Sequence, residues 1–270
     1  MAQAHRIQIK GLIRFSYLSE NGFANSAHGI EKARATLYDP DRLERRFALF
    51  ERLALHSLAI QDDPDFSVAI LIGDSLPDAA RQRLENLLVD FKQAHIVALP
   101  PMVHIQAVKQ AFAALPEHAK ATHIATFRQD DDDAMHRTTL ARIRSLGGTL
   151  LQTRENKRPF VIGFNRGFYF DPSAPEPITE WYERTPLGIG LAMIAPKGDP
   201  ATIFRRNHRQ LTEYYDCYTE TTRPMFIRSV HQDNDSAAST TGRRGQLRPA
   251  GIRRNLREGF DLTPEMLEKF

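Results

Sequence analysis

The first half of the chain alternates between two hydrophobic patterns. Short apolar runs typical of buried strands cover residues 7–15, 66–72, 96–99 and 123–127. Between these runs, apolar residues recur at helical spacing over residues 39–58, 76–91 and 103–115. Strands that alternate with helices in this way predict an α/β fold, in which a mixed, mostly parallel sheet is flanked by helices.

The second half of the chain is less regular. Residues 134–143 have helical spacing, and the pair Gly147-Gly148 predicts a turn soon after them. Residues 158–170 alternate apolar positions with short breaks, which we interpret as one strand or a hairpin. A late apolar run at residues 225–230 predicts a strand that ends at His231.

The composition changes toward the C-terminus. Past Ser236, the Ser, Ala, Thr, Gly and Arg content predicts a mobile segment, followed by a short amphipathic helix from Pro264. We therefore expect a single α/β domain over residues 1–236 and a basic C-terminal tail over residues 237–270.

Positive charge is concentrated in that tail. Six arginines and no acid lie between Gly242 and Arg257, although the formal net charge of the whole chain is only +3. The tail can be a disordered solubilising end, a segment that closes over an anionic ligand, or a contact to an anionic membrane surface that bears a lipid-linked acceptor. No aromatic residues stand among these arginines, so the tail does not indicate binding to nucleic acid.

The overall composition, 41% hydrophobic and 26% charged, is that of an ordinary globular protein. Cys217 is the only cysteine, which excludes an internal disulfide and fits a reducing compartment. The first residues lack the apolar core of a signal peptide, and no apolar run is as long as a membrane span. We expect a cytoplasmic protein. If it acts at a membrane, it does so from the inner surface, with the basic tail as the candidate contact.

Four consecutive aspartates, residues 130–133, follow the predicted strand at residues 123–127. Like charges at this density repel one another, and ligands of open α/β sheets bind where strands end. A hard divalent cation, Mg²⁺, Mn²⁺ or Ca²⁺ rather than Zn²⁺, would neutralise the run through oxygen ligands. From the residues alone, Asp132 is the expected metal contact, and Asp130, Asp131 and Asp133 are either ligands or nucleotide contacts.

Three further residues at strand ends have chemistry that fits a phosphate and metal site. Arg14 ends the first strand and Arg128 directly precedes the acids, so either guanidinium can bind a diphosphate by forked hydrogen bonds. Each can instead form a structural ion pair. His231 ends the late strand and is followed by Gln, Asp, Asn and Asp, so its imidazole is a candidate metal ligand.

The segment from Phe127 to Ala134 resembles the Arg-x-Asp-Asp-Asp-Asp-Ala segment of a rhamnosyltransferase family of GT-A-type glycosyltransferases with an Asp-x-Asp motif. Residues 13–16 are similar to the opening Thr-Arg-Phe-Asn of that family, with Ile13 and Ser16 as departures. Further similar stretches are Arg46, residues 49–51 and 55–58, Gln61 and Phe66, with His56 in the place of a proline. The resemblance covers roughly residues 7–235.

The resemblance implies a GT-A-like domain, a nucleotide-sugar donor and a divalent cation, Mn²⁺ or Mg²⁺. It implies transfer of a sugar, with rhamnose suggested by the family label, to a carbohydrate or lipid-linked glycan acceptor, in a hexosyl transfer of the inverting type. Its implied donor-binding residues are Arg14, Phe15, Arg128, Asp130 and Asp131. Its implied metal ligands are Asp132, Asp133 and His231.

An inverting transferase also needs a general base for the acceptor hydroxyl. We take Glu180 as the candidate, with Glu176, Glu183, Asp171 and Asp216 as alternatives. Trp181, the single tryptophan, can stack on a sugar face or pack internally. Two other functions stay open: a nucleotidyltransferase, which uses similar metal and phosphate chemistry, and a non-catalytic domain in which the acids hold a structural divalent cation.

Overall fold

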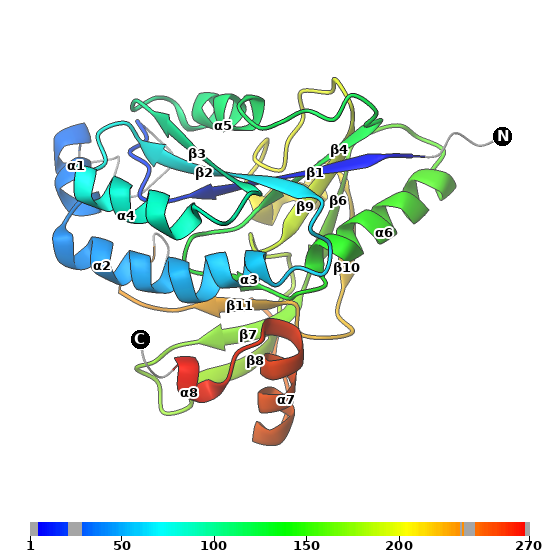
Figure 1. Ribbon diagram of the computed structural model, residues 1–270. Helices are drawn as coiled ribbons and strands as arrows, with labels where there is room; N and C mark the ends of the chain where they lie inside the picture. Colours follow the sequence, from blue (N-terminus) through cyan, green and yellow to red (C-terminus); the bar gives the residue numbers. More distant parts are fainter. Residues whose placement is uncertain (1–4, 21–28, 233, 235–240, 268–270) are drawn as a thin grey trace.

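The computed structural model describes residues 5–20, 29–232, 234 and 241–267. Its larger sheet has the strand order β10-β6-β9-β4-β1-β2-β3 (Figure 1). The strands are β1 (Ile7–Arg14), β2 (Phe66–Gly73), β3 (Ala94–Leu99), β4 (His123–Arg128), β6 (Phe160–Phe164), β9 (Leu191–Pro196) and β10 (Asp216–Glu220). Only β9 runs against its neighbours β4 and β6, so the predicted mixed and mostly parallel sheet is confirmed.

The order of these strands creates a switch point next to β1. The chain proceeds from β1 to β2 and β3 on one side, and then crosses to β4 on the other side of β1. Crossovers leaving neighbouring strands in opposite directions open a crevice at the carboxyl ends of those strands, where open α/β sheets bind ligands. The residues after β1 and after β4 therefore meet at one edge of the sheet.

Side chains of β1 explain why it lies at the centre of the sheet. Ile9 and Ile13 pack on one face and Leu12 on the other, and all three are fully buried. Gly11 leaves room for the ring of Phe127, which a Cβ atom at Gly11 would meet at 2.2 Å. The aromatic residue of β4 can thus lie directly across the backbone of β1.

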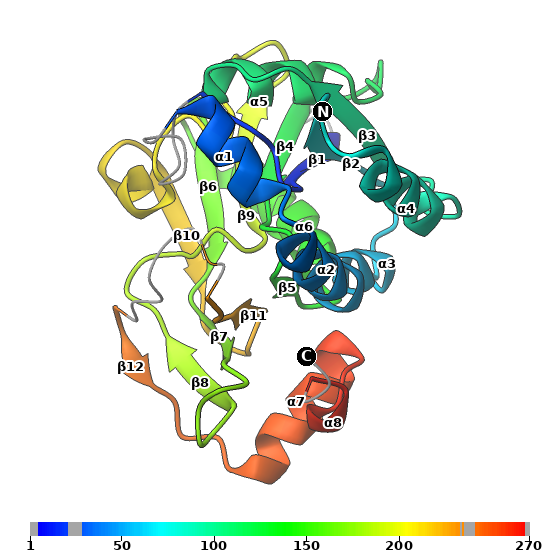
Figure 2. The same ribbon diagram turned by 90° about the vertical axis from the view of Figure 1, so that its left-hand side faces the viewer.

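Helices cover both faces of this sheet (Figure 2). Helix α5 (His104–Ala113) packs against one face. The other face is covered by α4 (Asp78–Leu88), α6 (Thr139–Thr153) and a continuous helical run made of α2 (Pro40–Leu49), the π-helix η2 (Phe50–Leu55) and α3 (His56–Ala59). Asp39 caps this run by accepting the Arg42 N–H at 2.9 Å, which confirms the predicted helix start. The remaining helices of this part are α1 (Ile30–Leu37) and the 3₁₀-helix η3 (His208–Glu213).

A second sheet has the strand order β12-β8-β7-β11-β5 and lies beyond α2 and η2 (Figures 1 and 2). Its strands are β5 (Ala134–Met135), β7 (Arg166–Phe170), β8 (Ile178–Tyr182), β11 (Phe226–Ser229) and β12 (Arg243–Arg244). Two C-terminal helices, α7 (Pro249–Phe260) and α8 (Pro264–Leu267), cover it. Leu53 of η2, Phe168 of β7 and Phe260 of α7 share its apolar core.

Two expectations for residues 134–148 are wrong. Residues 134–143 do not form one helix, because Ala134–Met135 is strand β5 and α6 begins only at Thr139. The pair Gly147-Gly148 is not a turn but lies inside α6. Gly147 packs so closely on the larger sheet that a Cβ atom there would meet the Ile194 side chain at 2.3 Å. Packing on the sheet favours helix at this pair over its intrinsic turn preference.

The other corrections concern long-range pairing. Residues 158–170 form neither one strand nor a hairpin, because β6 and β7 belong to different sheets. The mobile segment expected past Ser236 is also wrong where the structure describes it, since β12 covers Arg243–Arg244 and α7 covers Pro249–Phe260. Residues 235–240 lie outside the described part. Among the described residues, no helix has both the length and the apolar character needed to cross a bilayer.

Candidate functional site

The four aspartates lie directly after β4, at the switch point beside β1. Asp131, Asp132 and Asp133 are buried, with 3%, 5% and 6% of their surfaces exposed, while Asp130 is partly exposed. The buried amide of Gln129 shapes the turn that carries them, because its Nε2 donates to the Asp133 carbonyl at 2.9 Å and to Ser57 Oγ at 3.1 Å. The acid run is therefore an ordered part of the site.

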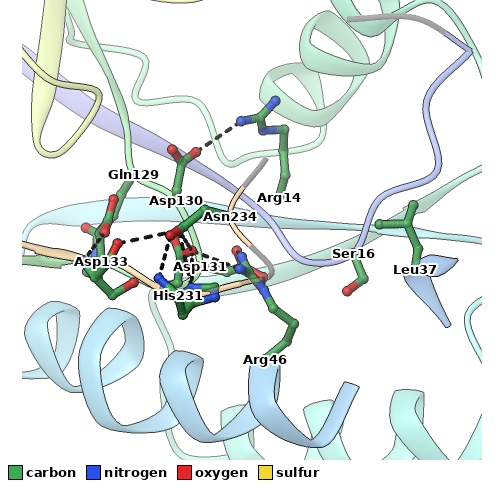
Figure 3. A network of polar contacts seen from close by, with 12 residues as sticks. Arg14, Ser16, Leu37, Arg46, Gln129, Asp130, Asp131, Asp133, His231 and Asn234 are labelled. Carbon is green, nitrogen blue, oxygen red and sulfur yellow. Dashed lines mark hydrogen bonds and ion pairs between the residues drawn. The ribbon is translucent and has the colours of Figure 1, made fainter. Parts of the chain in front are cut away.

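Arg46 of α2 holds the middle of the run. Its guanidinium donates through Nε to Asp131 Oδ2 at 3.2 Å and through Nη2 to Asp131 Oδ1, while Nη1 donates to Asp132 Oδ2 at 2.8 Å. Figure 3 shows Arg46 rising from its helix toward Asp131. A single buried guanidinium thus bridges two buried carboxylates and fixes their positions.

The late histidine joins the same carboxylate. His231 Nε2 lies 2.9 Å from Asp132 Oδ2, and Asn234 Nδ2 donates to that oxygen at 3.1 Å. Burial alone would raise the pKa of Asp132, but the charges of Arg46 and His231 hold it below its usual range. Asp132 is therefore a carboxylate anion at neutral pH, as a metal ligand must be.

Asp133 has a different environment from Asp132. Its Oδ1 accepts the N–H of Ser229 on β11 at 3.0 Å, which ties the acid run to the second sheet. Burial raises the pKa of Asp133 well above its ordinary value, and the neighbouring charges of Asp132 and Asp130 raise it further. The structure thus shows Asp133 bound to Ser229, whereas Asp132 is the aspartate in contact with His231.

Arg14 and Arg128 converge on Asp130 from neighbouring strands. Arg14 Nη2 lies 3.0 Å from Asp130 Oδ1, and Arg128 Nη2 lies 3.5 Å from the same oxygen. Burial would raise the pKa of Asp130, but Arg128 and Arg14 lower it. Within the described part of the chain, the buried Nε of Arg128 has no hydrogen-bond acceptor. Two guanidinium groups thus approach one carboxylate oxygen.

Two histidines near these arginines are neutral at physiological pH. Burial lowers the pKa of His104 to about 4, and Arg14 and Arg128 lower it in the same direction. Burial, with Arg128 as the next cause, lowers the pKa of His208 to about 3. His104 Nε2 lies 3.4 Å from Arg14 Nη1. The site can thus orient its arginines without adding further charge.

Two predicted residues lie outside this constellation. Phe15 is fully buried between Phe47 and Phe50, with ring centroids 4.7 and 5.2 Å away, so its side chain belongs to the core. Glu180 is 3% exposed on β8, where it accepts from Arg166 Nε at 2.7 Å and from the Leu247 N–H at 2.9 Å. Donor contact by Phe15 and base catalysis by Glu180 stay predictions.

The geometry fits a divalent cation only in part. Across the described residues, no three His, Cys, Asp or Glu side chains gather as a complete metal shell. Asp132 Oδ2 and His231 Nε2, however, are 2.9 Å apart, which matches two neighbouring ligands of an octahedral cation with bonds of about 2.1 Å. Such a cation usually takes its other ligands from substrate phosphates and water. The pair therefore fits a metal that shares its shell with a ligand.

The family model described as "Putative rhamnosyl transferase" matches residues 8–243. The chain belongs to this family. The match includes all of the site residues described above, and the expected family resemblance is confirmed. No curated protein matched the sequence of the chain.

Among the solved structures that match the chain are three with low sequence identity and TM-scores below 0.5. The S. aureus TarS fragment 1-349 in complex with UDP-GlcNAc is 13% identical, with a TM-score of 0.43, over 86% of this chain and 62% of that chain. S. aureus TarS is 14% identical, with a TM-score of 0.42, over 83% of this chain and 37% of that chain. A "putative nucleotide-diphospho-sugar transferase" from Desulfovibrio desulfuricans G20 is 8% identical, with a TM-score of 0.36, over 83% of this chain and 81% of that chain. The chain thus spans less than two thirds of the TarS chains.

Sequence reasoning did not assign roles to several residues of the site in this rhamnosyl transferase family member. Arg46 and Ser57 stood within the similar stretches, and only the fold shows that Arg46 contacts the acid run and that Ser57 accepts from Gln129 beside it. Ser16 has a left-handed φ of 48° and accepts from Arg42 Nη1 at 3.2 Å. The family has Asn at this position, and Asn adopts a left-handed conformation more readily than most residues. The backbone conformation is thus a physical reason for the residue that the family has here.

Proposed function

We propose that the chain is a metal-dependent glycosyltransferase of the GT-A type, which moves a sugar from a nucleoside-diphosphate donor to a carbohydrate acceptor. The observation that carries the proposal is the pair Asp132–His231 at the switch point, next to the two arginines around Asp130. A place for a cation and a place for a diphosphate lie side by side there. Family membership supports a sugar-transfer function.

The donor diphosphate would lie against Arg14 and Arg128. Both guanidinium groups lie close to Asp130, and the buried Nε–H of Arg128 has no acceptor among the described residues. Anionic oxygens satisfy such donors through charge-assisted hydrogen bonds. Asp130, which is partly exposed, would accept hydrogen bonds from the nucleotide, and Asp131 would keep its backbone in place through Arg46.

Asp132 and His231 would hold Mn²⁺ or Mg²⁺, and Asp133 is the neighbouring buried acid of the run. When bound, the cation would stabilise the negative charge that grows on the leaving diphosphate. Asn234 donates to Asp132 through its side chain and accepts from the backbone N–H of His231 at 2.7 Å, and so ties the two ligand residues together. Arg46 keeps the Asp132 carboxylate ionised.

The acceptor hydroxyl needs a base near this site. Among the carboxylates considered, Asp171 lines a cavity that His231 also lines, while Glu180 and Glu176 line a different one. Asp171 Oδ1 accepts the Ser173 N–H at 2.9 Å and its hydroxyl at 2.6 Å, which fixes the carboxylate. We therefore favour Asp171 over Glu180 as the base of an inverting transfer.

The reaction can be tested with a panel of UDP-, dTDP- and GDP-sugars, including dTDP-rhamnose because of the family description. Wild type with Mn²⁺ should release free nucleoside diphosphate from one donor class, and chelation with EDTA should stop the release. Asp132→Asn should lower the rate at least about tenfold, because a metal ligand loses its charge. Asp90→Asn, a change at an exposed aspartate, is the matched control and should behave as wild type.

The products separate the possible functions. Release of pyrophosphate in place of nucleoside diphosphate would assign a nucleotidyltransferase. Loss of thermal stability on chelation, with no donor cleaved, would assign a structural cation and contradict the proposal.

A further inference from the structure

Strand β11 carries an arginine, Arg228, to which the proposed function gives no role. Successive side chains of a strand point to opposite faces of its sheet. Ile227 packs in the apolar core that α7 covers, together with Phe168 of the neighbouring strand β7. Phe226 packs on the opposite face, in the core that also contains Phe127 of β4. Arg228 alternates with Ile227, so it lies on the face of the second sheet that turns toward the larger sheet.

This face of β11 ends at the acid run. The residue after Arg228 is Ser229, which donates its backbone N–H to Asp133 Oδ1 at 3.0 Å. Burial and the neighbouring aspartates raise the pKa of Asp133, and the charge of Arg228 acts against that shift. Burial and Arg128 lower the pKa of His208, and Arg228 lowers it further. Arg228 thus lies near the acid run and also near the histidine beside Arg128.

A buried chain of hydrogen bonds holds the guanidinium of Arg228. Tyr169 lies directly opposite it on β7, and the Tyr169 hydroxyl accepts from Arg228 Nη1 at 3.2 Å. The guanidinium also lies over the Tyr169 ring, 5.4 Å from its centroid. The same hydroxyl donates to Glu183 Oε1 at 2.8 Å. Glu183 Oε2 accepts the Thr241 N–H at 3.0 Å and the Thr241 hydroxyl at 2.6 Å, so the chain is anchored at its far end.

The half-buried guanidinium of Arg228 has donors that the described part of the chain does not use. It forms one hydrogen bond there, to Tyr169, and no ion pair with a carboxylate. Burial lowers the pKa of Arg228, and this effect is outweighed by Tyr169, Asp133 and Glu183, whose carboxyl groups are bound to other residues. A cation held away from water without a paired anion is costly. An anionic oxygen of a ligand would accept the remaining N–H groups.

We propose that Arg228 is a catalytic residue that binds the phosphate next to the transferred sugar. The proposal rests on the proposed function. In that reaction the acceptor oxygen forms a bond to the anomeric carbon of the sugar and gives its proton to the base. The bond from this carbon to the phosphate oxygen breaks, and the oxygen keeps the bonding electrons. Arg228 would donate to this phosphate from the second sheet, while Arg14 and Arg128 bind the diphosphate from the larger sheet.

Nucleotide binding without turnover tests the position of Arg228. The probes are the mono- and diphosphates of uridine, thymidine and guanosine, titrated by calorimetry with Mn²⁺ present. Wild type should bind one diphosphate more tightly than the corresponding monophosphate. Arg228→Gln should weaken binding of that diphosphate about tenfold, because a charge-assisted contact is lost, and should leave the monophosphate unchanged. A purely structural role would change the binding of both nucleotides alike.

Three further variants accompany this measurement. Arg142→Gln, at an arginine of α6 that pairs with Glu220, is the matched control and should bind both nucleotides as wild type does. Tyr169→Phe removes the hydroxyl that holds Arg228 and should weaken the diphosphate about threefold. Arg228→Lys keeps a positive charge and should recover part of the affinity that Arg228→Gln loses. Circular dichroism confirms that each variant is folded.

Turnover of the donor gives a second measure. Negative charge on the phosphate grows as the bond to the sugar breaks, so the contact with Arg228 strengthens in the transition state. Arg228→Gln should therefore lower kcat at least about tenfold and change KM for the donor much less. Arg142→Gln should leave both parameters unchanged.

The inference is overturned if Arg228→Gln binds the diphosphate as tightly as wild type, or if it weakens both nucleotides by the same factor. If Arg228→Gln does not fold, unchanged diphosphate binding and unchanged kcat in both Tyr169→Phe and Arg228→Lys overturn it. Wild type that binds no nucleotide and cleaves no donor contradicts the proposed function itself. The two failures are therefore distinguishable.

Discussion

At the scale of single residues, Arg46 supplies the positive charge that allows Asp131 and Asp132 to be buried as carboxylates. Its guanidinium contacts Asp131 and Asp132, and both partners are at least nine-tenths buried. Removing one partner of a buried ion pair is costly because the remaining charge has lost both water and its counter-ion. The sequence showed the four acids but not this partner, which comes from a helix about 85 positions earlier.

Arg46→Met should therefore lower the free energy of unfolding by about 3–5 kcal/mol. Arg83→Ala is the matched control, because Arg83 pairs with Glu44 at the surface and its loss should cost at most about 1 kcal/mol. Urea unfolding at pH 7 measures both changes. Equal losses for the two variants would show that Arg46 is not the counter-charge of the acid run.

At the scale of elements, the sequence predicted the parts that depend on local pattern. The strands β1, β2 and β4 and the helical run from Pro40 agree with the apolar periodicity. The expectations failed where pairing over long distances decided the structure. Residues 158–170 divide between two sheets, and α6 continues through two glycines because one of them packs on the larger sheet. Neither outcome is encoded in the periodicity of the segment itself.

The two glycines of α6 provide a matched comparison. A Cβ atom at Gly147 would meet Ile194 at 2.3 Å and Ile7 at 3.1 Å, whereas one at Gly148 would meet nothing within 4 Å. Gly148→Ala should stabilise the protein by about 0.5–1 kcal/mol through helix propensity. Gly147→Ala should instead destabilise it by about 1–3 kcal/mol, because the packed interface must shift. Thermal unfolding of the two variants is the measurement, and stabilisation of both would contradict the packing described for α6.

At the scale of the whole molecule, the chain brings distant segments to one edge of the larger sheet. The sequence placed Arg14, Arg128, the four acids and His231 at strand ends. The switch point explains why the ends of β1 and β4 meet, while His231 follows β11 of the second sheet, which Ser229 ties to Asp133. It did not place the C-terminal arginines, because α7 packs on the second sheet through Leu256 and Phe260. The sequence also did not show that Phe15 is buried. An aromatic residue at the end of a strand looks the same in the sequence whether its side chain is buried or exposed.

The pairing of Asp132 with His231 is the feature on which the proposed function depends. Electron paramagnetic resonance of Mn²⁺ tests it directly, by following the loss of free-ion signal on addition of protein with UDP, dTDP or GDP. Wild type should bind Mn²⁺ with at least one nucleotide, Asp132→Asn should weaken that binding at least about tenfold, and Asp90→Asn should leave it unchanged. No nucleotide-dependent binding by wild type, or equal binding by Asp132→Asn, would contradict the account.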